Sequence, residues 1–252
     1  MSADGTSRPC ALVTGASRGI GRAVAAALAA AGHDVVVHYN ANRRAAEETV
    51  ALARSAGARA WSVQADLSSP EGPDQLLSDT MHAVGRIDVI VNNAAGLWVG
   101  EPRDISDQQL NAIFAVNVIA IYRLIAMAGP LLPDGGRIIN VSSDAARLPR
   151  PLAAAYAASK AAVESLTMSF AQWLGDRGVT VNAVAPGPVR TEMMAGFLAD
   201  EKTEAALNRS SAQARVGMPD DIVPIVLFLV RRESQWVNGQ TIEATGGRVA
   251  AW

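Results

Sequence analysis

Short apolar runs alternate with longer segments of helical periodicity along almost the whole chain. The apolar runs are continuous, which is typical of strands covered by helices on both faces. They predict strands at residues 10–14, 34–39, 59–64, 87–92, 136–142, 179–185 and 240–244. The segments between them predict helices at about 19–31, 43–56, 70–84, 107–129, 155–175 and 219–231.

This order of elements predicts an α/β fold, a doubly wound (Rossmann) parallel sheet of about seven strands with helices on both faces. We expect a single domain over residues 9–252 and a flexible polar N-terminus over residues 1–8. The least regular region, residues 186–218, is too long for a plain turn. Long connections in compact domains are often lids, so it predicts a substrate lid.

Composition narrows the class of protein. The 252 residues are 50% hydrophobic with a formal net charge of −2, which suits one large core and gives no basic stripe for nucleic acid. No apolar run reaches the roughly 18 residues needed to span a bilayer, and the first residues lack the features of a signal peptide. We therefore expect a cytoplasmic protein. The single cysteine, Cys10, lies in a predicted buried strand and is expected to pack.

Tyr156 and Lys160 stand four residues apart, with Ser143 thirteen residues upstream. Residues four apart project from the same face of a helix. A free tyrosine has a pKa near ~10, and a cation beside it favours the phenolate. The pair therefore predicts a proton-transfer device, with Lys160 lowering the pKa of Tyr156.

A glycine-rich turn, TGASRGIG, directly follows the first predicted strand and precedes a helix. Its glycines, Gly15, Gly19 and Gly21, allow the backbone to approach a diphosphate closely, and the helix N-terminus attracts the anion. At the end of the second strand, the segment from His38 to Arg44 contains no acid to hold a ribose 2′-hydroxyl. Arg18 and Arg43 are candidates for a 2′-phosphate, so we expect NADP(H) to be favoured over NAD(H). Arg43 has the alternative of being a solvated residue at the start of a helix.

These elements, in this order and spacing, make the chain resemble a short-chain dehydrogenase/reductase from about residue 9 to 247. The matching motifs are TGASRGIG, Asp66-Leu67, NNAAG (92–96), Asn117, Ser143, YAASK (156–160) and PGPVRTEM (186–193). The resemblance implies one dinucleotide-binding and catalytic domain. The cofactor contacts it implies, with the strand-end residues added, are Gly15, Ser17, Arg18, Gly19, Ile20, Gly21, Tyr39, Asn40, Arg43, Asp66, Leu67, Asn92, Ala94, Gly96, Pro186, Gly187, Val189 and Thr191.

The same resemblance implies an oxidoreductase that reduces a ketone to a secondary alcohol, or the reverse. Tyr156 would exchange the proton with the substrate oxygen, Ser143 would hydrogen-bond that oxygen, and Lys160 would hold the nicotinamide ribose. Asn117 would anchor a water that connects Lys160 to solvent. Ser142 is the adjacent rival to Ser143, and the spacing to Tyr156 favours Ser143. The three histidines have no ligand-like spacing, and no metal is expected.

The sequence gives less information about the substrate than about the cofactor. The pocket is predicted between the Ser143–Tyr156 segment and the lid, with walls that suit a hydrophobic or aromatic ketone. Its expected residues are Leu97, Trp98, Ala145, Met193, Met194 and Phe197. Arg147 and Arg150 either meet an anionic substrate or are solvated.

The resemblance is nearest to the 3-oxoacyl-carrier-protein reductase branch, in which basic residues near the entrance dock the carrier protein. Arg177 matches one such position, but Asp134 stands at another. A reductase for a polyketide or secondary-metabolite ketone is therefore a serious alternative to a 3-oxoacyl reductase, and a sugar or steroid alcohol dehydrogenase is a third. Outside that class, a non-enzymatic nucleotide-sensing protein or an isomerase on the same fold stays open.

Relatives in the family are commonly tetramers built on two long helices. The resemblance therefore implies a homotetramer or homodimer, with the small face of residues 155–171 allowing close packing. Trp252 is a candidate for burial at such an interface. The expected partners are a small ketone or alcohol, free or carrier-bound, with no nucleic acid and no membrane.

Overall fold

The computed structural model describes residues 8–248 and contains the predicted sheet. Its strands are β1 (Cys10–Val13), β2 (Asp34–Tyr39), β3 (Ala60–Gln64), β4 (Val89–Asn92), β5 (Arg137–Val141), β6 (Thr180–Pro186) and β7 (Thr241–Ala244). All pair in parallel, in the order β3-β2-β1-β4-β5-β6-β7. The predicted fold class is confirmed. The predicted N-terminus, apart from Arg8, and Trp252 lie outside the described residues.

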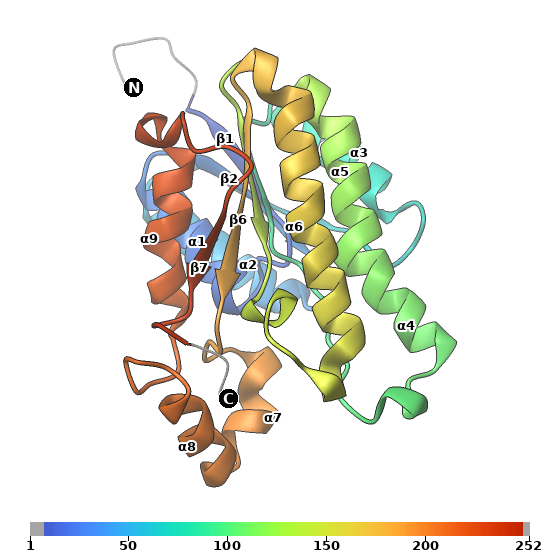
Figure 1. Ribbon diagram of the computed structural model, residues 1–252. Helices are drawn as coiled ribbons and strands as arrows, with labels where there is room; N and C mark the ends of the chain where they lie inside the picture. Colours follow the sequence, from blue (N-terminus) through green and yellow to red (C-terminus); the bar gives the residue numbers. More distant parts are fainter. Residues whose placement is uncertain (1–7, 249–252) are drawn as a thin grey trace.

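Two helical layers cover the two faces of the sheet (Figure 1). One layer contains α1 (Gly19–Ala30), α2 (Arg43–Ser55) and α9 (Pro219–Val230), and the other α3 (Gly72–Val84), α5 (Ala120–Ala128) and α6 (Ala154–Leu174). Successive residues of β1 alternate between them, with Ala11 and Val13 in the first core and Cys10 and Leu12 in the second. This double burial is why the strands read as continuous apolar runs. Cys10 is buried, as predicted.

The predicted helix at 107–129 is divided. It consists of α4 (Asp107–Phe114), a π-helical turn (Ala115–Ile119) and α5. The continuous stretch Asp107–Leu131 is, by length and composition, one helix that would be able to cross a membrane. Its buried residues pack against α3 and α6, which explains its apolar character within the fold.

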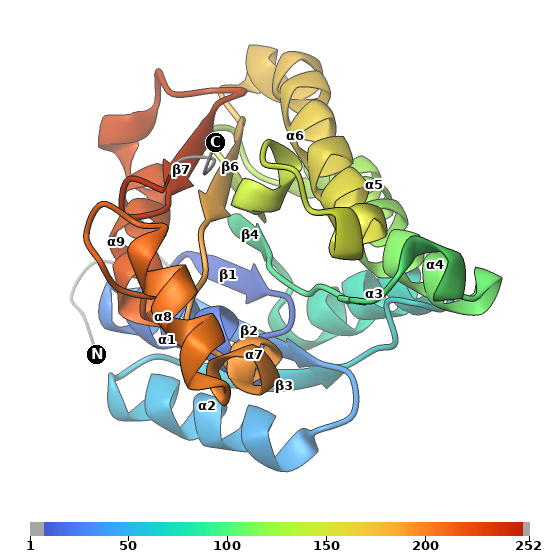
Figure 2. The ribbon, with the colours of Figure 1, turned by 60° about the horizontal axis from the view of Figure 1, so that its bottom comes forward.

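The irregular region after β6 contains helices that the sequence pattern did not predict. They are a 3₁₀ turn (Glu192–Met194), α7 (Ala195–Leu198) and α8 (Glu201–Arg209). Figure 2 shows α7 and α8 in front of the sheet, and in Figure 1 they lie beyond the end toward which β6 and β7 point. The strand order reverses between β1 and β4, and ligands of doubly wound sheets bind beyond the carboxyl ends at this point.

Candidate active site

The glycine turn after β1 is held tightly by its neighbours. Gly15 has a φ of 61°, and a Cβ there would lie 2.9 Å from Ala94 Cα, so only glycine fits without strain. The Asn93 amide donates to the carbonyls of Thr14 (2.8 Å) and Gly15 (3.1 Å). The Thr14 hydroxyl accepts the N–H groups of Asn93 and Ala94, both at 2.9 Å. The turn is thereby fixed before the twelve-residue helix α1, whose N-terminus suits an anion.

His38 also supports this turn, from the end of β2. Its Nδ1 accepts the Gly15 N–H at 3.1 Å, and its Nε2 lies 3.1 Å from the Ala65 carbonyl. This pattern requires a neutral ring that donates from Nε2. Burial lowers the pKa of His38 to about 4 and keeps the ring neutral. His38 therefore couples the glycine turn to the segment that carries Asp66, a role that its sequence position did not reveal.

The two arginines predicted to bind a 2′-phosphate differ in their position relative to the cavity. Arg18 lines the cavity, and its side chain makes no hydrogen bond or ion pair with any residue from 8 to 248. Arg43 is exposed at the first position of α2 and does not line the cavity, which agrees with its alternative role as a solvated residue. Asp66 lines the cavity and accepts the Ser68 N–H and hydroxyl, and these hydrogen bonds lower its pKa.

One cavity of about 1160 Å³ runs from the adenine end of the site to the region predicted as a lid, residues 186–218. Its cradle of glycine backbone, helix N-terminus and free guanidinium fits an extended dinucleotide. It includes most of the predicted cofactor contacts, namely Gly15, Ser17, Arg18, Gly19, Ile20, Tyr39, Asn40, Asp66, Leu67, Ala94, Gly96, Pro186, Gly187, Val189 and Thr191. It also includes every predicted substrate-pocket residue: Leu97, Trp98, Ala145, Met193, Met194 and Phe197.

Four predicted site residues do not line the cavity. Besides Arg43, these are Gly21, Asn92 and Asn117. A Cβ at Gly21 would lie 2.4 Å from the Gly15 carbonyl oxygen, so this glycine lets α1 pack under the turn. Asn92 is buried and donates to Asn140 Oδ1 at 2.8 Å, which ties β4 to β5.

Asn117 lies in the π-helical turn and is fully buried. Its amide donates to the Gly96 carbonyl (3.0 Å) and the Ser159 hydroxyl (2.9 Å), and its Oδ1 accepts the Gly96 N–H (2.8 Å). These bonds engage the side chain, so it positions Gly96 and α6 instead of facing the cavity. The predicted water-anchoring role of Asn117 therefore gains no support from its side chain.

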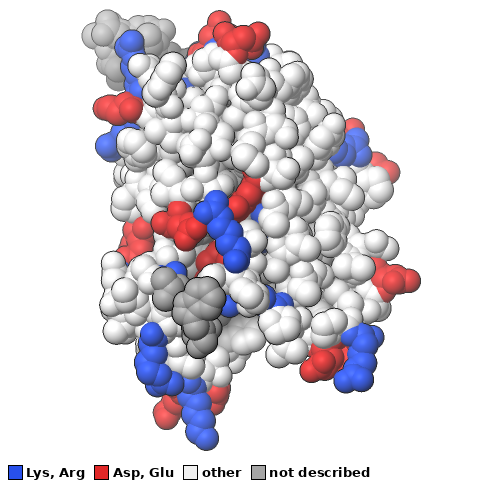
Figure 3. Space-filling model, in the orientation of Figure 1, with Lys and Arg blue, Asp and Glu red and all other residues white. Residues whose placement is uncertain are grey.

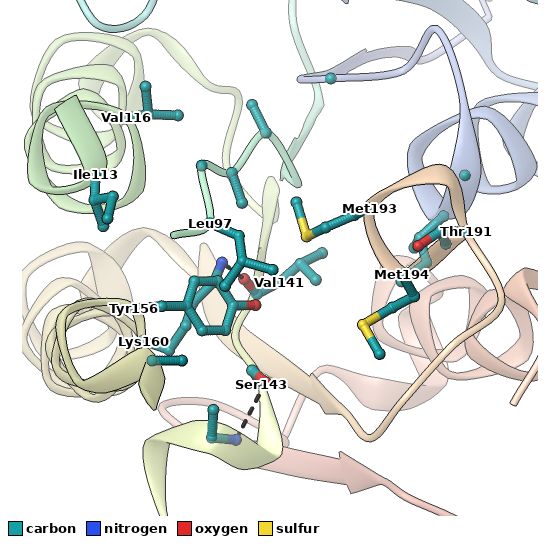
Figure 4. Close-up of a pocket in the computed structure, with 18 of the residues that line it drawn as sticks. Leu97, Ile113, Val116, Val141, Ser143, Tyr156, Lys160, Thr191, Met193 and Met194 are labelled. Carbon is teal, nitrogen blue, oxygen red and sulfur yellow. Dashed lines mark hydrogen bonds between the residues drawn. The ribbon is translucent and has the colours of Figure 1, made fainter. Parts of the chain in front are cut away.

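Ser143, Tyr156 and Lys160 converge on the wall of the cavity (Figure 4). The Tyr156 ring lies 5.7 Å from Lys160 Nζ, as the four-residue spacing on α6 predicts. Ser143 follows β5, accepts the Ala145 N–H at 3.2 Å and lies near Tyr156 on the cavity wall, where it lowers the pKa of that phenol. The rival Ser142 is buried, and its one hydroxyl hydrogen is shared between the Lys160 carbonyl oxygen (3.2 Å) and Glu164 Oε1 (3.1 Å). The geometry thus brings Ser143, and not Ser142, to the phenol.

The protonation of this group differs from the sequence prediction. Burial raises the pKa of Tyr156 to about 12, against a lowering effect of the Ser143 hydrogen bond and with a further raising effect of Asp144. Burial lowers the pKa of Lys160 to about 8, and its Nζ donates to the Val141 carbonyl at 2.7 Å. The predicted lowering of the Tyr156 pKa by Lys160 is not what this geometry gives, because desolvation acts on both groups.

The substrate end of the cavity contains residues that no motif indicated. Ile113 and Val116 contribute from the α4 region and Leu207 from α8, beside Met193 and Met194 of the lid. Asp144, Arg150 and Arg248 also line this cavity, whereas Arg147 does not. Arg147 pairs with Glu164 and Glu243 on the surface. Among residues 8–248, no group of three or more His, Cys, Asp or Glu side chains would hold a metal ion.

Arg177, the candidate for carrier-protein docking, does not line the cavity of its own chain. It follows the C-terminal end of α6, about 30 Å along the helix axis from Tyr156 at 1.5 Å per residue. Its guanidinium pairs with Asp134 and donates to the carbonyls of Gly129 and Pro130. Within one chain, this residue is occupied in closing the end of the helix, and its match to a carrier-docking position stays a prediction.

Comparison with known proteins agrees with this geometry. The profile of a family described as "Enoyl-(Acyl carrier protein) reductase" matches residues 15–248. A short-chain type dehydrogenase/reductase of Picea abies is 39% identical over 249 residues, covering 95% of this chain and 92% of the relative.

Two solved reductases are similar over almost their whole length. The reductase LugOII, which catalyses keto-reduction at C1 during lugdunomycin biosynthesis, is 40% identical with a TM-score of 0.88, over 95% of this chain and 97% of that one. The angucycline C-6 ketoreductase LanV, solved with bound NADP, is 36% identical with a TM-score of 0.89, over 95% of each chain. On this evidence the chain is an oxidoreductase that belongs to the short-chain dehydrogenase/reductase family.

Proposed function

We propose that this protein is an NADP(H)-dependent ketoreductase that interconverts a ketone and a secondary alcohol. The single observation that carries the proposal is the meeting of Ser143 and Tyr156 on one cavity that begins at the glycine turn. Two hydroxyl donors side by side suit a carbonyl oxygen that gains negative charge during reduction. LugOII and LanV, both named as reductases of ketones, are similar over nearly the whole chain.

The chain's own residues supply binding and proton transfer. The bound nicotinamide would supply the hydride, with Pro186, Gly187, Val189 and Thr191 on that part of the wall. With a raised pKa, Tyr156 is protonated at neutral pH, and the Lys160 ammonium beside it would stabilise the phenolate that forms once the proton passes to the substrate oxygen. Ser143 orients that oxygen, and Lys160 offers a buried ammonium beside the phenol.

The preference for NADP(H) rests on charge at the adenine end. Arg18 faces the cavity, and the end of β2 carries Tyr39, Asn40 and Asn42 with no carboxylate. A free guanidinium binds a 2′-phosphate through its planar donors, whereas a ribose diol is usually held by an acid. The relative LanV, solved with NADP, supports the same assignment.

For the substrate, we propose a bulky polyketide-type or other secondary-metabolite ketone. The apolar wall of Leu97, Trp98, Ile113, Met193 and Met194 suits an aromatic or alicyclic ring system. Arg177 is paired with Asp134 within the chain, so its side chain adds no support for a carrier-bound 3-oxoacyl substrate. A sugar would need more polar groups on this wall, and a steroid alcohol is the remaining alternative.

The test is loss of NADPH absorbance with a panel of ketones: 1-tetralone, trans-1-decalone, a quinone, acetoacetyl thioester, diacetyl, a keto-sugar and a 3-ketosteroid. We expect turnover of the bicyclic ketones, and kcat/KM for NADPH above that for NADH by about ten- to hundredfold, the worth of one charge-assisted hydrogen bond. Turnover of thioesters alone, or equal use of the two cofactors, would contradict the proposed substrate or cofactor respectively.

We further propose a cytoplasmic homo-oligomer, a tetramer or dimer, that pairs through α5 and α6. Large apolar side chains are exposed there, with Tyr122 53%, Met168 58% and Trp173 51% exposed. Figure 3 shows few charged side chains over the middle of this face. Light scattering coupled to size exclusion tests it, and a monomer at micromolar concentration would contradict it.

A further inference from the structure

Two arginines share one carboxylate at the substrate end of the cavity. Arg150 Nη2 lies 3.2 Å and Arg248 Nη1 2.5 Å from the same atom, Asp144 Oδ2. The other oxygen, Oδ1, accepts the Ser143 hydroxyl at 3.3 Å. Arg248 follows β7, about a hundred residues from Asp144 in the chain. One negative and two positive charges leave this cluster, Asp144–Arg150–Arg248, with a net charge of +1.

The cluster is withdrawn from bulk water yet open to the cavity. The side chains of Asp144 and Arg248 are only 7% and 11% exposed, and Arg150 is 28% exposed. All three line the cavity that holds Ser143 and Tyr156. A guanidinium has five donor hydrogens. Among the described residues, the side chain of Arg248 donates only through Nη1.

Among residues 8–248, the nearby acids do not neutralise the surplus charge. Glu164 and Glu243 are paired with Arg147 outside the cavity. Glu192 lies at the phosphate end, where its Oε2 would be 3.7 Å from a Cβ placed on Gly19. A charge with little exposure to water interacts strongly with a counter-ion, because the surrounding dielectric screens it weakly.

We propose that Arg150 and Arg248 form an anion subsite that recognises an ionised oxygen, a phenolate or a carboxylate, of the ketone substrate. The subsite adjoins Ser143 through Asp144, so the acidic group of the substrate lies on the same side as the reacting carbonyl. The inference rests on the proposed ketoreductase function and narrows its substrate to acidic ketones. Hydroxylated aromatic ketones meet both demands, an apolar ring for Leu97 and Met194 and an ionisable oxygen for the arginines.

The experiment measures binding of two ligands of the same shape, 2-naphthoate and 2-naphthamide, to the protein saturated with NADP⁺. The wild type should bind the anion about tenfold more tightly, as expected for one charge-assisted pair with little exposure to water. Arg248→Gln and Arg150→Gln should each abolish this preference and leave naphthamide binding unchanged. Arg248→Lys should keep most of it. Arg147→Gln is the matched control, because this arginine neighbours the cluster but lies outside the cavity.

A second pair of ligands separates the two anions. Binding of 4-nitrophenol should strengthen above its own pKa and 4-nitroanisole binding should not, if the subsite accepts phenolates as well as carboxylates. Strengthening with 2-naphthoate alone assigns the subsite to carboxylates. No preference for either anion in the wild type, or equal losses for acid and amide in the variants, would overturn the proposal.

These measurements need no turnover. A protein that prefers 2-naphthoate through both arginines but reduces no ketone would keep the subsite and refute the proposed function. With an active enzyme, the same variants should raise KM for 3-acetylbenzoate while kcat, and KM for 3-acetylbenzamide, stay unchanged. A uniform fall of kcat for both substrates would point to a structural role of the cluster.

Discussion

The two ends of the cavity are built by different means. The cofactor end is made largely of backbone, in one short turn held by Asn93, Thr14 and His38. The substrate end is assembled from side chains of segments far apart in the chain, including α4, the turn after β5, the lid and Arg248. A backbone site tolerates almost no change in residue type, whereas a side-chain site accepts many solutions. Substitutions at the cofactor end are therefore expected to cause large losses of binding, and substitutions at the substrate end smaller ones.

The largest effect is expected at the turn. Gly15→Val adds a Cβ that would lie 2.9 Å from Ala94 Cα and forces a branched residue to a φ of 61°. The strain of at least about 1–2 kcal/mol, with blocked approach of a diphosphate, should weaken NADPH binding by more than about a hundredfold in fluorescence titration. Gly32→Ala is the control, because Gly32 also has a positive φ but an added Cβ meets no atom within 4 Å. Equal losses in both would show that general strain, and not the cradle, is responsible.

Lys160→Met should raise the free energy of unfolding and lower kcat. Lys160 is buried, and its pKa falls from 10.5 to about 8. The folded protein therefore binds fewer protons than the unfolded one between these values, so the lysine's burial costs stability below pH 8 and ceases to cost it above pH 10.5. After the lost hydrogen bond to Val141 is subtracted, the variant should gain about 1–2 kcal/mol at pH 7. Its kcat should fall by about a hundredfold or more, the usual scale of a proton-transfer group.

Urea unfolding and steady-state kinetics measure the two effects. Lys202→Met, at an exposed position, is the control and should change neither. A variant that is both less stable and inactive would contradict the view that Lys160 is retained for function at the cost of stability.

His38 should set part of the acid stability of the cofactor end. Its pKa is 6.5 when unfolded and about 4 when folded. The unfolded state thus takes up the proton first, so stability is complete above pH 6.5 and falls by about 3 kcal/mol as pH drops toward 4. His38→Phe should flatten that decline in urea unfolding, leaving the smaller contribution of His33, whose pKa burial also lowers. The exposed His82→Gln should keep the full decline, and an unchanged slope in the His38 variant would refute the assignment.

The smallest effect is expected at the substrate end. Met194→Ala removes part of the lid wall and should raise KM for a bicyclic ketone by several-fold, the cost of roughly 1 kcal/mol of apolar contact. NADPH binding and kcat should stay unchanged. Leu52→Ala, on the exposed face of α2, is the control. A large loss of NADPH affinity in the Met194 variant would contradict the claim that the substrate end and the cofactor end of the cavity act separately.

The same contrast explains what the sequence was able to predict. Strands β1 to β7 were predicted within two residues because burial on both faces leaves an unbroken apolar pattern. Gly15, Tyr156 and Lys160 were predictable because local spacing determines their geometry. The helices α7 and α8 were not, since amphipathic segments of four and nine residues give little periodicity. The pairing of Arg248 with Asp144 depends on tertiary structure alone, as does the orientation of the Asn117 amide away from the cavity.

The central claim is that the Tyr156 hydroxyl transfers the proton at the end of the cavity that Ser143 and Lys160 define. The most direct measurement is kcat and NADPH affinity of Tyr156→Phe. The control is Tyr122→Phe on α5, which removes a hydroxyl outside the cavity and keeps the aromatic ring at the proposed subunit contact. We predict that kcat falls by about 10²- to 10⁴-fold in the Tyr156 variant only, with NADPH affinity unchanged. A near-native kcat in Tyr156→Phe would contradict the account.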